Sequence, residues 1–192
     1  MTADQDQHGR NRLLAALRPP DFALLEPHLQ IVPIREGAFL HLPGDEIDKV
    51  YFLHRGIVSL MAISEDGNAI STASVGSEGA IGTIAGTGFV RAFTQAMVQA
   101  AGVASRIAVP HFRRAVRKSE AINDLLTRYQ MALMCQVQQT SLCNSVYDAT
   151  SRLSRLLLVL SEQGKDHTIS FSQERLGGHP GWQGVNENTV NS

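Results

Sequence analysis

The chain has 192 residues, of which 43% are hydrophobic and 18% charged, and its formal net charge is -1. This composition is ordinary for a globular protein with a sizeable core, and the near-neutral charge excludes the overall basic field of non-specific nucleic-acid binders. No run of about 18 hydrophobic residues occurs, and the amino terminus lacks an apolar stretch of signal length. We therefore expect a cytoplasmic protein without a membrane segment.

Residues 11–29 predict two short helices. Leucines and one phenylalanine recur at helical spacing on either side of Pro19-Pro20. Asp21 follows the two prolines and is expected to cap the second helix.

From Ile31 to Pro110 the pattern changes to short alternating runs separated by turn residues. Gly37, Gly44, Gly56 and Gly67 end or begin such runs, where a positive φ angle suits glycine. Regularly spaced short strands predict an antiparallel barrel or sandwich. The runs are IVPI, AFLHL, KVYFLHRG, IVSLMAI, AISTASV, AMVQAAG and ASRIAVP.

Helical periodicity follows, beginning with the amphipathic segment PHFRRAVRKS. Ser119 is positioned to cap the next helix, with Glu120 in its first turn, and we expect this helix to extend over about 27 residues. Its apolar stripe comprises Ile122, Leu125, Leu126, Tyr129, Ala132, Leu133 and Val137. After a break near Asp148, SRLSRLLLVLSEQGK predicts another amphipathic helix.

No charged residue lies between Arg128 and Asp148, but glutamines make this stretch too polar for a membrane span. An uncharged, amide-rich helix is most simply explained by packing between its own barrel and a second copy. We therefore expect a homodimer through residues 119–147. A helix packed wholly within one subunit is the alternative.

Recognisable catalytic and metal-binding motifs are absent from the sequence. The seven histidines are scattered, without HExxH or a Cys/His cluster of zinc spacing. His41 and His54 could meet on facing strands, as in cupin-type barrel enzymes, but the sequence offers no third ligand. Cys135 and Cys143 are expected to be packing thiols. We therefore expect no enzymatic activity, no metal and no cofactor.

The order of these parts resembles the Crp/Fnr (cyclic-AMP receptor) superfamily of bacterial transcription regulators, across essentially the whole chain. The motifs are EGAFLHLPGDEIDKVYFLHRGIVSL at 36–60, VGSEGAIG at 75–82, SRLSRLLLVL at 151–160 and the closing GVNENTV. The resemblance implies an α+β fold with three parts. Residues 1–117 form an antiparallel β-roll sensor with flanking short helices, 118–147 a dimerisation helix, and 148–192 an incomplete winged helix-turn-helix.

The resemblance also implies an effector pocket. In relatives that bind cyclic nucleotides, one segment opens a short helix whose N–H groups face the phosphate, and an acidic residue binds the ribose. The matching residues here are Gly76, Glu78, Gly79 and Ala80. The alternative is that Glu78 is a solvated turn carboxylate in a segment that has lost its role.

Those relatives neutralise the phosphate with an arginine on the next strand, and Gln95, preceded by Thr94, stands at that position. An amide cannot replace a bidentate guanidinium charge. We therefore expect a degenerate pocket in which cyclic AMP is not the ligand, and the effector stays open. An inward-folded loop that brings Arg91 to the phosphate is the alternative.

Residues 172–192, SQERLGGHPGWQGVNENTVNS, resemble the start of a helix-turn-helix. By this resemblance Ser172 caps the first helix and contacts a DNA phosphate, Gln173 lies in its first turn, and Asn186 caps a recognition helix that includes Asn188 and Thr189. The turn is longer than in the family, and Glu187 replaces a base-reading arginine. We expect a truncated module.

The resemblance implies a homodimeric, DNA-binding transcription regulator whose partner is promoter DNA. The alternative is a truncated sensor and dimerisation module without DNA binding of its own. A salt-dependent interaction with a palindromic promoter fragment distinguishes the two.

Overall fold

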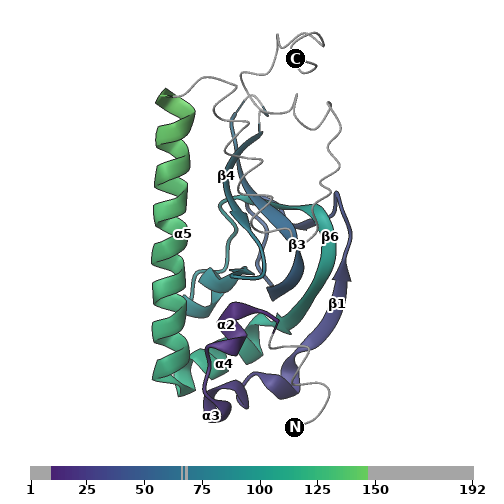
Figure 1. The fold of residues 1–192 in the computed structure, drawn as a ribbon, viewed down its shortest axis with the longest axis vertical. Helices are drawn as coiled ribbons and strands as arrows, with labels where there is room; N and C mark the ends of the chain where they lie inside the picture. The colour runs from purple at the N-terminus through teal and green to yellow at the C-terminus, as the bar shows by residue number, and fades with distance from the viewer. Residues whose placement is uncertain (1–9, 66, 68, 147–192) are drawn as a thin grey trace, which may run out of the picture.

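The computed structural model describes residues 10–146, except 66 and 68. Within this range, short helices precede a six-stranded antiparallel sheet, and two further helices follow it (Figure 1). The helical elements are α2 (Arg12–Ala15), α3 (Pro19–Phe22), η1 (Glu26–His28), η2 (Thr83–Thr87), α4 (Val109–Lys118) and α5 (Glu120–Val146). The strands are β1 (Gln30–Ile34), β2 (Phe39–His41), β3 (Lys49–Ile63), β4 (Ala69–Val75), β5 (Ala80–Ile81) and β6 (Gln95–Ala108).

The two short helices near the amino terminus occur where the leucine spacing predicts them. Asn11 caps α2 with a side-chain oxygen that accepts from the backbone N–H groups of Leu13 and Leu14. The prediction that Asp21 caps α3 is wrong, because Pro19 and Pro20 occupy the first two helical positions and place Asp21 in the first turn.

The sheet has the strand order β1-β6-β3-β4, with β2 paired to β6 and β5 paired to β3. Four of the expected runs join in pairs to form two long strands, β3 and β6. These two strands pair along most of their length, with several register shifts. Gly56 has φ +90° and does not end a strand: a β carbon there would lie 2.7 Å from the carbonyl oxygen of Ala100. A β carbon at the facing Gly102 would lie even closer to the carbonyl oxygen of Arg55. The two strands bend together here, which folds the sheet into a roll.

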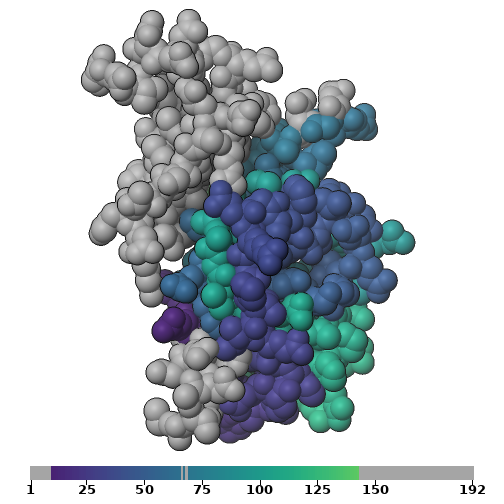
Figure 2. Space-filling view, turned by 90° about the vertical axis from the view of Figure 1, so that its right-hand side faces the viewer, coloured from purple at the N-terminus to yellow at the C-terminus, as the bar shows by residue number. Residues whose placement is uncertain are grey.

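Two apolar clusters form the core. One lies between the sheet and the helices and is centred on Phe52, Phe112 and Ile122. The other fills the roll and is centred on Leu53, Val58 and Val98. The space-filling view shows the residues of the N-terminal helices and first strands, coloured purple to blue, adjoining green residues of the later helices (Figure 2).

The cap predicted at Ser119 is confirmed. Its hydroxyl accepts from the N–H of Ile122 at 3.1 Å and donates to the carboxylate of Asp21 at 2.6 Å. One serine therefore starts α5 and ties it to α3. α5 has the expected 27 residues and runs beside β4 along the long axis of the molecule (Figure 1). No helix within residues 10–146 is both long and apolar enough to cross a membrane.

Candidate functional site

The segment expected to hold a phosphate, residues 76–80, is a turn that leads into β5. The predicted short helix does not begin here, because Ala80 pairs with Phe52 as a strand residue and the helical turn η2 starts only at Thr83. The N–H of Gly76 donates to the carboxylate of Glu78 at 2.7 Å, and the N–H of Gly79 donates to the carbonyl of Gly76 at 3.1 Å. Both N–H groups are thus bonded within the segment.

Tyr129 of α5 binds the end of this segment. Its hydroxyl accepts from the N–H of Ala80 at 3.1 Å and donates to the carbonyl of the same residue at 2.8 Å. A β carbon at Gly79 would lie 2.6 Å from the tyrosine oxygen, so glycine leaves the space that the phenol fills. Burial raises the pKa of Tyr129 to about 12, and the hydroxyl keeps its proton at neutral pH.

Asn11 and Arg12, near the start of the described chain, bind carbonyl groups of residues 76–80 and the neighbouring carbonyl of Leu53. The side-chain amide of Asn11, fully buried, donates to Gly79 at 2.8 Å and to Leu53 at 2.9 Å. The N–H of Arg12 donates to the carbonyl of Ser77 at 2.8 Å. Neither the role of Asn11 nor that of Tyr129 is evident in the sequence, since the residues that each one binds lie far away in the chain.

Gln95 lies at the start of β6 and pairs with Met61, near the end of β3, whereas Ala80 pairs near the beginning of that strand. Residues 76–80 and Gln95, the two predicted halves of the effector pocket, therefore lie beside opposite ends of β3. The amide of Gln95 contacts the sulfur of Met61 at 3.7 Å. Thr94, half-buried, precedes the strand.

Arg91 does not fold inward. It is exposed, pairs with Glu46 in an isolated bridge and directs its guanidinium to the carbonyl of Gly44 at 3.5 Å.

Two amide side chains have a buried atom without a hydrogen-bond partner among the described residues. These atoms are Oε1 of Gln99 and Nε2 of Gln130. Gln99 lies four residues after Gln95 on β6, at the register shift between the pairs Val58–Val98 and Ile57–Ala100. A buried acceptor of this kind is a position at which a ligand donor would be favourable.

The histidines considered for a metal site have other surroundings. His54 is buried and forms a 2.7 Å hydrogen bond between its Nε2 and the hydroxyl of Ser105. Burial lowers the pKa of His41, although Asp45 acts in the opposite direction. Within the described part of the chain, no group of three or more His, Cys, Asp or Glu side chains could hold a metal.

The long helix α5 has one face on the roll and one face in solvent. Leu133 packs against the cluster inside the roll, and the amide of Gln136 donates to the carbonyl of Ser74 at 3.2 Å. On the outer face, large apolar side chains are exposed: Met131 (57%), Met134 (55%) and Leu142 (55%). Ala132, predicted to lie on the apolar stripe, is also exposed.

The prediction that Cys135 is a packing thiol is wrong for the single chain, because the residue is exposed on this outer face. The predicted DNA-binding residues lie outside the described part of the chain: Ser172, Gln173, Asn186, Asn188 and Thr189. The helix expected after Asp148 and the helix-turn-helix expected to be truncated lie outside it as well.

No family model and no curated protein matches the chain. Solved structures do match. The global regulator CLP of Xanthomonas campestris, described as c-di-GMP-responsive, is 14% identical, with 84% of each chain covered and a TM-score of 0.68. FixK2 of Bradyrhizobium japonicum is 12% identical, with 79% of this chain and 76% of that chain covered and a TM-score of 0.65.

A regulatory subunit of a cAMP-independent protein kinase A from Trypanosoma brucei is 17% identical, with 66% of this chain and 45% of that chain covered and a TM-score of 0.57. The chain therefore has the cyclic-nucleotide-binding-like β-roll fold. It shares this fold with the regulators CLP and FixK2, as the sequence motifs predict.

Proposed function

We propose that this protein is a cytoplasmic, homodimeric transcription regulator of the Crp/Fnr type that binds promoter DNA and whose effector pocket no longer holds a cyclic nucleotide. The observation that carries the proposal is the likeness to the regulator CLP, which extends over 84% of both chains and so includes more than the β-roll alone. Shared fold supports a shared class of function, and the particular site decides the ligand.

The contacts of residues 76–80 support a pocket that does not take a cyclic phosphate. Phosphate sites of this kind depend on free backbone N–H groups. Here the N–H groups of Gly76, Gly79 and Ala80 donate to Glu78, Gly76 and Tyr129 instead. The sequence places Gln95 where relatives carry the neutralising arginine, so the charge partner is also missing from that position.

The outer face of α5 supports dimerisation. Met131, Cys135, Gln138 and Leu142 follow one another at intervals of four, three and four residues, which is the spacing of a coiled-coil seam. Each of these residues is exposed in the protomer. A second copy of the chain would bury Met131 and Leu142 of this seam without desolvating a charge, because no charged residue lies between Arg128 and Asp148.

Electrophoretic mobility of the full chain on palindromic promoter fragments from its own genome tests DNA binding. We expect a retarded complex whose affinity falls steeply with salt, because each phosphate contact releases counterions. Calorimetric titration with cyclic AMP tests the pocket, and we expect no saturable heat. A dimer without DNA binding at low salt would contradict the regulator proposal, and saturable cyclic AMP binding would contradict the degenerate pocket.

A further inference from the structure

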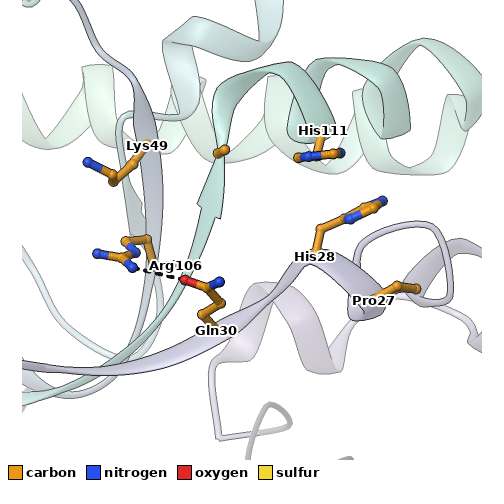
Figure 3. A pocket seen from close by; sticks show the side chains of 7 residues that line it. Pro27, His28, Gln30, Lys49, Arg106 and His111 are labelled. Carbon is orange, nitrogen blue, oxygen red and sulfur yellow. Dashed lines mark hydrogen bonds between the residues drawn. The ribbon is translucent and has the colours of Figure 1, made fainter.

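A second pocket lies away from residues 76–80, where η1, β1, β3, β6 and α4 approach one another (Figure 3). Its volume is about 280 Å³, and seven residues line it. Four of them carry basic side chains, and none of the seven is acidic. The lining residues are Pro27, His28, Gln30, Lys49, Arg106, Ala108 and His111.

The basic side chains come from four different elements. Figure 3 shows Lys49 and Arg106 on one side of the pocket and the rings of His28 and His111 on the other. The two imidazoles stack with centroids 3.9 Å apart and ring planes at 21°. Lys49 and Arg106 are close enough that the guanidinium charge acts to lower the pKa of the lysine, although Asp48 raises it overall. Like charges gathered in this way favour an anion between them.

Existing contacts leave donors available. Arg106 donates one N–H, from Nη2, to the side-chain oxygen of Gln30 at 2.9 Å, and a guanidinium has five such hydrogens. Lys49 binds the carboxylate of Asp48 at 2.7 Å, with the Asp48 side chain 69% exposed at the rim. Each imidazole keeps at least one N–H donor in either protonation state.

The start of α4 also borders the pocket. Ala108 is the N-terminal cap residue of this ten-residue helix, forms no side-chain cap hydrogen bond and lines the pocket together with His111 of the first turn. The N–H of Val109 donates to the carbonyl of Asp48, and Pro110 has none, so the uncapped end is not closed by a side chain. The partial positive charge of a helix N-terminus adds to the field of Lys49 and Arg106.

A metal ion fits this arrangement poorly. Imidazole nitrogens bind metals in the plane of the ring, and two nearly parallel rings stacked face to face cannot both direct a lone pair at one ion. The neighbouring lysine and arginine would repel a cation. The volume is slightly below the range of drug-sized ligand pockets, roughly 300–1,000 Å³, and so favours a small ligand over a nucleotide.

We propose that the pocket lined by His28, Lys49, Arg106 and His111 binds a phosphate group, either as free phosphate or as a small phosphate ester. This inference is independent of the regulator proposal and of residues 76–80. An arginine fork, an ammonium and ring N–H groups are the donors that a tetrahedral dianion requires.

Calorimetric titration of the full chain with inorganic phosphate, at an ionic strength held constant with chloride, tests the site. Glucose 6-phosphate forms a second arm, because a tighter fit than inorganic phosphate identifies an ester as the better ligand. We expect saturable binding that Arg106→Gln weakens about tenfold or more. Arg117→Gln, an exposed position on α4 outside the pocket, is the matched control and should leave the affinity unchanged.

Circular dichroism of each variant establishes that it is folded, and Lys49→Met replaces Arg106→Gln if that variant is not. Absence of saturable binding of both ligands up to about 50 mM, which corresponds to a negligible affinity, would overturn the proposal. Equal phosphate affinities of the wild type and the pocket variants would also overturn it. So would a glutamate-rich peptide that binds here when phosphate does not, since that result identifies a protein-docking surface.

Discussion

The hydroxyl of Tyr129 on α5 and the backbone of Ala80 on β5 exchange two hydrogen bonds, one in each direction, across 49 residues of sequence. These bonds connect the helix proposed to form the dimer with the segment to which the sequence resemblance assigns phosphate binding. A movement of residues 76–80 would therefore have to break or carry the contact with α5. The Tyr129 hydroxyl accepts the N–H of Ala80, which would otherwise be available to a ligand.

Replacing Tyr129 with phenylalanine removes both hydrogen bonds and keeps the ring. Because the N–H and carbonyl of Ala80 are then left without these partners in a buried strand, we expect a loss of about 1–3 kcal/mol in the free energy of unfolding. Urea denaturation followed by circular dichroism measures it. An unchanged midpoint would show that the two bonds contribute little.

Stability at alkaline pH should depend on the same residue. The folded-state pKa of Tyr129 is raised from 10.0 to about 12 by burial. A raised pKa favours the protonated phenol, so its contribution is complete below pH 10 and is lost as the pH rises through about 12. We expect the wild type to lose roughly 2–3 kcal/mol over this window relative to Tyr129→Phe. Parallel losses in both proteins would contradict the assignment.

Gly79 leaves room for the phenol. Alanine there would place a β carbon 2.6 Å from the tyrosine oxygen and 2.8 Å from Cγ1 of Val75. We expect Gly79→Ala to destabilise the protein by about 1–3 kcal/mol through overpacking. In a double-mutant cycle with Tyr129→Phe the two losses should be less than additive, because the closest contact is to the atom that phenylalanine lacks. Strict additivity would place the strain elsewhere.

Cys135 provides a direct probe of the proposed seam. If two copies of α5 pair in parallel through the outer face, the two Cys135 residues face each other near the two-fold axis. Mild oxidation of a Cys143→Ser variant should then give a disulfide-linked dimer on a non-reducing gel, since bridging requires Cα atoms within roughly 7 Å. Cys135→Ser is the matched control. A product that stays monomeric would place the seam on another face.

Local sequence patterns predicted much of the fold. The run AISTASV has the same bounds as β4, and Ser119 marks the start of α5 because N-capping depends on neighbouring residues alone. The role of Gly56 can be predicted only in part. Its positive φ angle is predictable, but whether it ends a strand or bends one depends on Gly102, which faces it from β6. Information of that kind is absent from a local window.

The candidate site shows the same division. The resemblance predicts that residues 76–80 open a short helix, whereas they form a turn into β5. The expectation that Gln95 stands in place of a phosphate-binding arginine stays a prediction. In the sequence, Tyr129 can be recognised only as one member of an apolar stripe, because the residue that its hydroxyl binds lies 49 residues away. The predicted stripe also includes Ala132, which is exposed in the structure. Periodicity alone does not distinguish a helix face that packs on its own subunit from a face that is free to bind a partner.

The proposed regulator requires that α5 form the surface that joins two subunits. Sedimentation equilibrium of the wild type and of Met131→Glu tests this directly, with Arg117→Gln on α4, which changes the net charge by the same one unit, as the matched control. We expect the wild type and the control to be dimers and Met131→Glu to be a folded monomer, because a carboxylate in an apolar seam costs several kcal/mol to bury. A wild type that sediments as a monomer, or a Met131→Glu variant that stays dimeric, would contradict the account.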